Sequence, residues 1–346
     1  MVPEKSPKCL SGKTLWHSSS IVAILTMAVT GTGLLAGCDR QGQGGRAGDN
    51  RPLVVCTTTM IADLARQIGA DRIRAVGIMP AGTDPHIYEP TPDDSVLFRK
   101  ADLVLYNGLH LEGKMVQMFS RAGDKAVALA EDPRIEPRGA GKQKGAPDPH
   151  CWWNAKYFAI YAEQACGALL RVDPDGEAAY RERTETYVAA LTALDARIRE
   201  AIERIPPGQR YLITSHDAFY YYGLAYGLKV DAVLGISTDA SVRALRIDEL
   251  TKLVVQHQIP AIFHETSVTA ALNEIVDRVV AQAAKRGHRV VVPDEALYSD
   301  SLGEEGTEAG TYLGALRMNT RIVVGGLAGE DVREILELEG GDHGGE

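Results

Sequence analysis

The sequence PDGEAAYRERTETYVAALTALDARIREAIERIPPG, residues 174–208, is the longest helical pattern of the chain. Its apolar residues recur at spacings of three, four or seven positions, and the prolines and glycine at its end stop a helix. The recurring residues are Tyr180, Tyr187, Leu191, Leu194, Ile198 and Ile202. A helix of about thirty residues, at about 1.5 Å per residue, is on the order of 45 Å long. We therefore predict that residues 174–205 form a rigid helix that links two lobes.

The sequence before this helix alternates between short apolar runs and amphipathic stretches. Thr91, followed by Pro92, predicts the start of a helix that continues to about residue 101. Alternating strands and helices imply a parallel sheet that is covered on both faces. The strands expected here are residues 53–57, 72–78, 102–106 and 126–129.

The sequence after the long helix repeats this alternation. The expected strands are residues 211–214, 230–234, 261–264 and 289–292, and the expected helices are residues 246–258, 271–286 and 310–324. We therefore expect an α/β fold of two lobes, each a four-stranded, mainly parallel sheet with helices on both faces. The lobes are expected to span residues 52–173 and 206–330, and residues 331–346 are expected to be a polar tail.

The first 38 residues have the features of an export signal. Three lysines precede an apolar run over residues 21–35, which is too short and too interrupted to span a membrane well. The run ends in Leu35-Ala36-Gly37-Cys38, which resembles a bacterial lipobox. Cleavage would then precede Cys38, and the lipidated cysteine would anchor the protein to the membrane facing the periplasm or the cell exterior. A plain secretory signal is the alternative, and the glycine-rich residues 39–51 are expected to be a flexible tether.

The composition is that of a globular protein, with 24% charged and 45% hydrophobic residues in 346. A net charge of -9 argues against a nucleic-acid partner, because no basic surface is available to neutralise phosphates. Beyond the signal, Cys56, Cys151 and Cys166 remain, and an odd number excludes a closed disulfide framework. Cys56 and Cys166 are expected in the core, and Cys151 is a weak ligand candidate beside His150.

One tripeptide occurs twice, as Asp84-Pro85-His86 and as Asp148-Pro149-His150. Proline fixes its own φ and restricts the residue before it, so each histidine is placed on a stiff loop. A pair of ordinary turns with surface histidines is the alternative interpretation. Further ligand residues elsewhere in the chain would favour a shared site.

His216 and Asp300, like the two repeated histidines, follow predicted strands. Open parallel sheets bind ligands beyond the carboxyl ends of their strands, so two facing lobes would bring two such side chains each to one point. Three imidazoles and one carboxylate can bind a first-row divalent metal. Alternatively, His216 caps the following helix and Asp300 is a turn residue.

Over residues 53–326 the chain resembles the metal-binding lipoprotein receptors of ABC transporters, the TroA-like zinc and manganese group. Five motifs in the family's order carry the resemblance: residues 82–90, 107–113, 148–154, 215–219 and 298–303. It implies two four-stranded lobes joined by one long helix, with ligands at His86, His150, His216 and Asp300. It also implies an ABC permease as the partner of a monomeric receptor that is not an enzyme.

The resemblance leaves the metal open between Zn²⁺ and Mn²⁺, with Fe²⁺ also compatible. Manganese-specific relatives often have glutamate in place of His216, whereas zinc-specific relatives often have a histidine-rich loop where residues 134–147 contain none. The alternatives are a zinc hydrolase with Glu265 as the base, and an adhesin-type surface lipoprotein. The Asp84 and Asp148 carboxylates are expected near ligand N–H groups. The other histidines, expected to be structural, are His110, His257, His264 and His288.

Overall fold

The computed structural model describes residues 49–139, 147–239 and 244–337, which belong to one compact unit. The expected signal segment, its lipidation site Cys38 and most of the expected tether lie outside these residues. Within the described ranges, no helix combines the length and apolar character that a membrane span needs.

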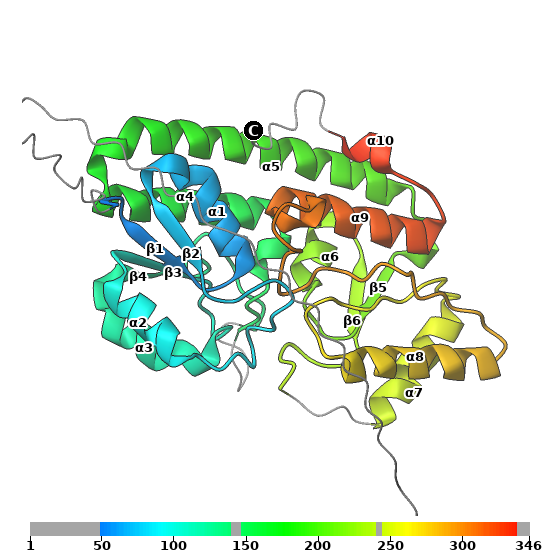
Figure 1. Cartoon of the computed structure of the whole chain (residues 1–346). Helices are drawn as coiled ribbons and strands as arrows, with labels where there is room; N and C mark the ends of the chain where they lie inside the picture. Colours follow the sequence, from blue (N-terminus) through cyan, green and yellow to red (C-terminus); the bar gives the residue numbers. More distant parts are fainter. Residues whose placement is uncertain (1–48, 140–146, 240–243, 338–346) are drawn as a thin grey trace, which may run out of the picture. The chain divides into compact units, whose positions relative to one another are not determined.

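The first half of the described chain contains a four-stranded parallel sheet (Figure 1). Its strands are β1 (Leu53–Cys56), β2 (Arg74–Gly77), β3 (Leu103–Tyr106) and β4 (Ala126–Ala128), in the order β2-β1-β3-β4. Val54 of β1 lies opposite Ala75 of β2 on one side and opposite Leu103 of β3 on the other. These are the four strands expected from the sequence, and their parallel arrangement is confirmed.

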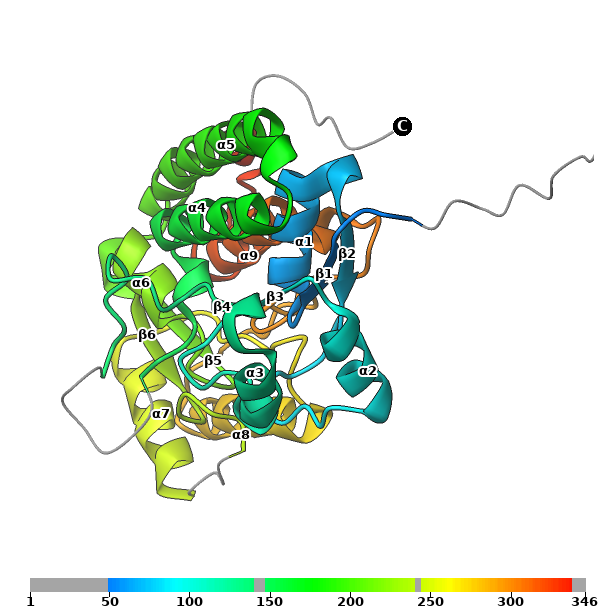
Figure 2. The same ribbon diagram turned by 90° about the vertical axis from the view of Figure 1, so that its left-hand side faces the viewer.

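The two faces of this sheet pack against different helices (Figure 2). Successive strand residues point to opposite faces, so Val54 and Cys56 join the core with α1 (Thr59–Gly69) and α4 (Ala155–Val172). Leu53, Val55 and Val104 pack instead with Phe98 of α2 (Pro92–Lys100) and Phe119 of α3 (Val116–Ala122). Thr91 and Asp94 form the capping box that starts α2, as the sequence predicts.

The long helix α5 spans Glu177–Glu203, 27 residues, after a 3₁₀ turn at Pro174–Gly176. All six apolar residues that predict it are buried. The helix contacts α1 and α4 of the first half, and also α6 (Tyr220–Tyr226), α9 (Tyr312–Ala328) and α10 (Arg333–Leu336) (Figure 1). One rigid element therefore supports both halves.

The second half differs from the expected four strands. It contains β5 (Tyr211–Thr214) paired in parallel with β6 (Lys229–Ala232). The other two expected strands pair only through the single bridge Ala261–Val291, and a second single bridge, Glu265–Leu297, lies beyond their expected ends. Pro260 and Pro293 bound these segments, and proline cannot donate a ladder hydrogen bond. The helices α7 (Ala244–Gln256) and α8 (Ala270–Lys285) pack against each other in this half.

The start of the expected polar tail is also structured. Arg333–Leu336 forms α10, Leu336 is buried, and Arg197 of α5 donates to the Ile335 carbonyl at 3.1 Å. Residues 338–346 lie outside the described ranges. The remaining short 3₁₀ helices are η1 (Ala70–Arg72), η2 (Gly113–Met115), η3 (Gly123–Lys125), η4 (Cys151–Trp153), η6 (Pro207–Gln209) and η7 (Glu308–Gly310).

Candidate metal centre

The structure brings together the four residues that the sequence singles out. One possible ligand atom from each of His86, His150, His216 and Asp300 lies within 4.8 Å of the others. The loops after β2, β4 and β5 supply the histidines, and the segment after the Glu265–Leu297 bridge supplies Asp300. The His86 side chain is 5% exposed and the other three are fully buried.

Asp300 lies at the middle of this cluster. Its Oδ2 lies 3.0 Å from His216 Nε2 and 3.6 Å from His86 Nε2, and its Oδ1 lies 3.5 Å from His150 Nε2. The Nε2 atoms of His86 and His150 are 3.2 Å apart. Neither Asp300 oxygen has hydrogen-bond geometry with any residue of the described ranges. Buried polar atoms without partners are costly, and a bound cation would satisfy both oxygens.

The protonation of the cluster follows from burial and from the charges within it. Burial lowers the pKa of His86 to about 3, so this imidazole is neutral. Burial opposes ionisation of Asp300, but the imidazoles of His216 and His150 outweigh it and hold the carboxyl pKa below its ordinary value. Burial likewise opposes protonation of His216, yet Glu265 and Asp300 raise its pKa well above the ordinary value. A cation would displace the proton of His216.

Asp148 orients the ring of His150. Its Oδ1 accepts a hydrogen bond from His150 N at 3.1 Å and lies 2.7 Å from His150 Nδ1. The outer ring nitrogen thus faces a carboxylate, and Nε2 is directed into the cluster. This is the contact that the sequence predicts for Asp148.

Glu265 supports His216 in a similar way. Its Oε1 accepts a hydrogen bond from His216 N at 2.7 Å, and its Oε2 lies 2.6 Å from His216 Nδ1. The hydrolase alternative needs Glu265 as a base that faces a metal-bound water. Because both of its oxygens face His216 instead, the structure contradicts that role.

Asp84 differs from these two carboxylates. Its Oδ1 accepts from the backbone N–H of His86 at 2.9 Å, and its Oδ2 accepts from Thr238 Oγ1 at 2.6 Å. Asp84 therefore accepts from an N–H group of a candidate ligand residue, as expected, but from its main chain and not from its ring. Asp84 orients the main chain of the His86 loop, because the rigid Asp-Pro-His turn places its carboxylate on the backbone.

The motif at residues 107–113 supports the His150 loop. Asn107 Nδ2 donates to the Pro149 carbonyl at 3.1 Å, although 42 positions separate the two residues. The turn that follows has positive φ at Gly108 (87°), Leu109 (53°) and His110 (65°), which is uncommon outside glycine. Buried Glu112 stabilises this turn by accepting from Asn107 N at 2.8 Å and Gly108 N at 3.3 Å.

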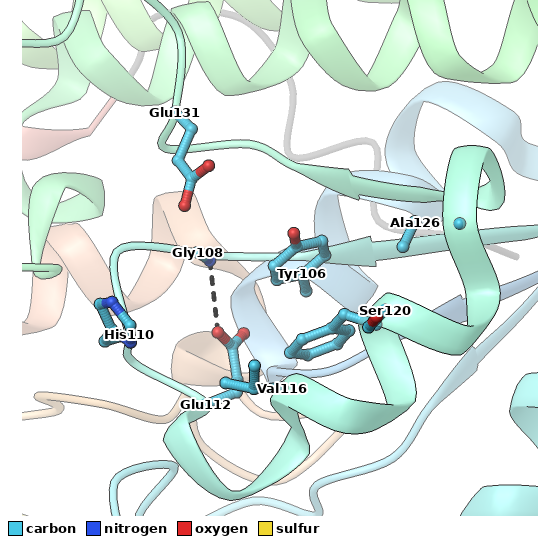
Figure 3. A pocket seen from close by; sticks show the side chains of 10 residues that line it. Tyr106, Gly108, His110, Glu112, Val116, Ser120, Ala126 and Glu131 are labelled. Atoms are coloured by element: carbon cyan, nitrogen blue, oxygen red, sulfur yellow. Dashed lines mark hydrogen bonds between the residues drawn. The ribbon is translucent and has the colours of Figure 1, made fainter.

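His110 itself lies at a separate pocket of about 410 Å³, beside Tyr106, Glu112 and Glu131 (Figure 3). None of the four clustered residues lines this pocket. The other three histidines also lie elsewhere: His257 contacts Tyr211, His264 contacts Asp277, and His288 contacts the Ile259 carbonyl.

Two tryptophans connect the His150 loop to the Asp300 loop. Trp152 and Trp153 both donate from Nε1 to the Ser299 carbonyl, at 3.1 and 2.8 Å. Both indoles lie two and three positions after His150 in the motif at residues 148–154, which is the one sequence signal that could have indicated them. Buried Cys151 lies between them and His150, with its Sγ 3.9 Å from the Asp148 carbonyl. Burial raises the pKa of this thiol to about 12, and it is not part of the cluster.

Comparisons with known proteins agree with this geometry. The family model "ZnuA: Zinc-uptake complex component A periplasmic" matches residues 54–326. The manganese-binding lipoprotein MntA of Bacillus subtilis is 34% identical over 305 residues, which cover 87% of this chain and 97% of the relative. The zinc-binding protein TroA of Treponema pallidum is 36% identical over 284 residues, 82% of this chain and 91% of the relative.

The solved structure of the periplasmic zinc-binding protein TroA from Treponema pallidum has the same α/β fold. It matches with a TM-score of 0.75 and 34% sequence identity, covering 80% of this chain and 99% of that chain. From its sequence and its fold together, the chain belongs to the family of the zinc-uptake complex component A, periplasmic.

Proposed function

We propose that this chain is an extracytoplasmic solute-binding protein that captures a divalent transition metal and delivers it to an ABC permease. The observation that carries the proposal is the convergence of three imidazoles and one carboxylate at a buried point. Every ring supplies a nitrogen to this point, and both oxygens of Asp300 face it. Such a set binds first-row divalent metals.

The proposed cargo is Zn²⁺ or Mn²⁺, and the ligand set also accepts Fe²⁺. Three nitrogen ligands favour zinc on affinity alone, because zinc lies above manganese and iron in the order of divalent-metal affinities. Two inward-facing carboxylate oxygens also allow a larger coordination number, which suits manganese. The relatives differ in the same respect, since MntA is named for manganese and TroA for zinc.

A receptor fits the geometry better than a hydrolase does. A catalytic zinc usually keeps three protein ligands and an open position for water. Here Asp300 lies within the cluster as a fourth group, and Glu265 faces His216. Among the described residues, the centre therefore has ligands for holding an ion, and its one neighbouring candidate base faces a histidine. We infer that the chain is not an enzyme.

The organisation of the chain follows from this function. We propose residues 52–173 and 206–330 as two metal-binding lobes, residues 174–205 as their rigid connection, and lipidated Cys38 as the membrane anchor. The chain would act as a monomer on the periplasmic or outer face of the membrane. Metal release would require the lobes to separate or Asp300 to move, because the four side chains are nearly inaccessible.

The test is a metal titration of the full chain, purified in detergent and stripped of metal. We expect one equivalent of Zn²⁺ or Mn²⁺ to bind tightly, and Asp300→Ala to weaken binding strongly. His288→Ala is the matched control, because this histidine contacts the Ile259 carbonyl and lies outside the cluster. Equal affinities of the parent and Asp300→Ala proteins would contradict the site.

The same preparation separates the receptor from the hydrolase. Zinc-loaded protein is incubated with ester, peptide and phosphate substrates, and product is measured over time. We expect none, whereas turnover that depends on zinc would contradict a receptor without enzymatic activity.

A further inference from the structure

Arg138 lies in the loop between β4 and His150, and it belongs to none of the motifs discussed above. Its side chain is 29% exposed. Arg138 and the residues that it contacts, Asp148, Asp217, Tyr220 and Tyr221, are called the Arg138 cluster below. One end of this cluster lies in the first half of the chain and the other end in the second half.

In the first half, Arg138 contacts the carboxylate that orients His150. Arg138 Nη2 lies 2.7 Å from Asp148 Oδ2, while Asp148 Oδ1 faces the imidazole. The main chain of the same two residues is also joined, because Asp148 N donates to the Arg138 carbonyl at 2.9 Å. Arg138 therefore fixes both the carboxylate and the backbone that place His150.

In the second half, the same guanidinium contacts the loop that carries His216. Nη2 donates to Asp217 Oδ2 at 2.7 Å, and Asp217 directly follows His216. The guanidinium carbon lies 4.0 Å from the centre of the Tyr220 ring, which is a cation–π contact. The Tyr221 hydroxyl accepts from Arg138 N at 2.7 Å and donates to the Asp148 carbonyl at 3.0 Å.

The charges explain why this arrangement matters. Asp148 and Asp217 both contact a single nitrogen of Arg138, so the two carboxylates are close neighbours. Without the cation between them they would repel each other, with little screening in a largely buried place. The repulsion would separate the His150 loop from the His216 loop.

We propose that Arg138 is a positioning residue that holds the His150 and His216 loops together and so sets how slowly the centre releases its metal. The inference rests on the proposed function. It assigns to Arg138 a role in retention, without direct contact with the ion. Loss of a group that orients a metal ligand typically weakens metal binding by about 10- to 100-fold. Since Arg138 acts through Asp148, we expect the lower end of this range.

The experiment measures metal release from the full-length protein. Zinc-loaded protein is mixed with an excess of a chromogenic chelator, and the dissociation rate is compared among variants. We expect Arg138→Gln to release zinc about tenfold faster than the parent. Arg138→Lys keeps the charge and should restore part of the slow release. With Co²⁺ as a probe, Arg138→Gln should also change the visible absorption of the bound ion.

Arg72 provides the matched control. It is 33% exposed, its Nε lies 2.8 Å from Asp173, and its guanidinium carbon lies 5.8 Å from the centre of the Tyr180 ring. Arg72→Gln therefore removes a similar interaction away from the metal centre, and we expect release at the parent rate.

Three outcomes would overturn the inference. These are an unchanged release rate in Arg138→Gln, equal acceleration in Arg138→Gln and Arg72→Gln, and, if Arg138→Gln does not fold, an unchanged rate in Asp217→Ala, which removes the contact between Arg138 and the His216 loop. A parent protein that binds no metal would instead contradict the proposed function. The two failures are thus distinguishable.

Discussion

His150 and His216 occupy corresponding places in the two halves of the molecule. The carboxylates that face their Nδ1 atoms, however, differ in their other partners. Asp148 faces His150 Nδ1 with one oxygen and forms an ion pair with Arg138 through the other. Glu265, behind His216, pairs with no lysine or arginine in the described part of the chain. A carboxylate at the outer ring nitrogen raises the basicity of a histidine ligand, and a cation beside that carboxylate reduces this effect. The comparison predicts that His216 is the stronger donor of the two.

Replacing each of the two histidines with alanine should have the largest effects on metal affinity and on stability. We expect His150→Ala and His216→Ala each to weaken metal binding by more than the roughly 100-fold that loss of an outer partner costs. His216→Ala should also destabilise the metal-free protein by about 3 kcal/mol, since it leaves the buried Oε2 of Glu265 without its imidazole partner, whereas Asp148 keeps Arg138. Metal titration and thermal unfolding measure the two effects. Equal losses of stability would contradict the difference between the two carboxylates.

Replacing the carboxylates tests the difference directly. We expect Glu265→Gln to weaken metal binding by about 100-fold and Asp148→Asn by about tenfold. The reason is that the negative charge of Glu265 acts on His216 alone, while Arg138 already compensates part of the negative charge of Asp148. Competition titrations against a chelator of known affinity give both values. The opposite order would mean that Arg138 does not reduce the influence of Asp148.

His216 should contribute to the dependence of metal binding on pH. Glu265 and Asp300 raise its pKa above the ordinary value despite burial, so a proton occupies the metal-free ring near neutral pH. Metal must displace this proton, and affinity should therefore fall by up to about tenfold for each unit that the pH drops below that pKa. His86 adds nothing until about pH 3, because burial lowers its pKa to about 3. Titrations at several pH values check this, and Glu265→Gln should flatten the profile.

Asp84→Asn should have the smallest effect. The amide oxygen of Asn can still accept a hydrogen bond from His86 N, and its NH2 group can donate to the Thr238 hydroxyl oxygen. Asp84 also makes no contact with the His86 ring. We expect metal affinity within a few-fold of the parent in the same competition titration. A loss as large as that of Asp148→Asn would show that the charge of Asp84 acts on the ion.

The sequence predicts the parts of the fold that depend on local pattern. The six apolar residues of α5 repeat at helical spacing, and all are buried. The four strands of the first sheet are likewise confirmed. The second sheet is less regular than expected, and Pro260 and Pro293 limit its outer segments at their ends. Its Ala261 and Val291 still pair, so the topology is retained while the regular ladder is not.

The four residues of the centre are predictable for a related reason. Each follows a strand or a strand-like segment, and parallel sheets bring such positions to one edge. Their supporting residues are not predictable in this way, because their contacts cross long stretches of sequence. Asn107 reaches Pro149, and Glu265 reaches His216 from 49 positions away. Arg138 belongs to no motif, and only the tertiary structure shows that it contacts the carboxylates of Asp148 and Asp217.

The two indoles behind His150 give the molecule an internal optical reporter. The chain has three tryptophans, and the two in the described ranges both donate to the carbonyl that precedes Asp300. Trp153 also stacks on Phe219 and Tyr312. Indole fluorescence responds to hydrogen bonding of the ring N–H and to neighbouring aromatic rings. Displacement of Asp300 during metal release would therefore change the intrinsic emission, so the transfer step can be followed without an attached label.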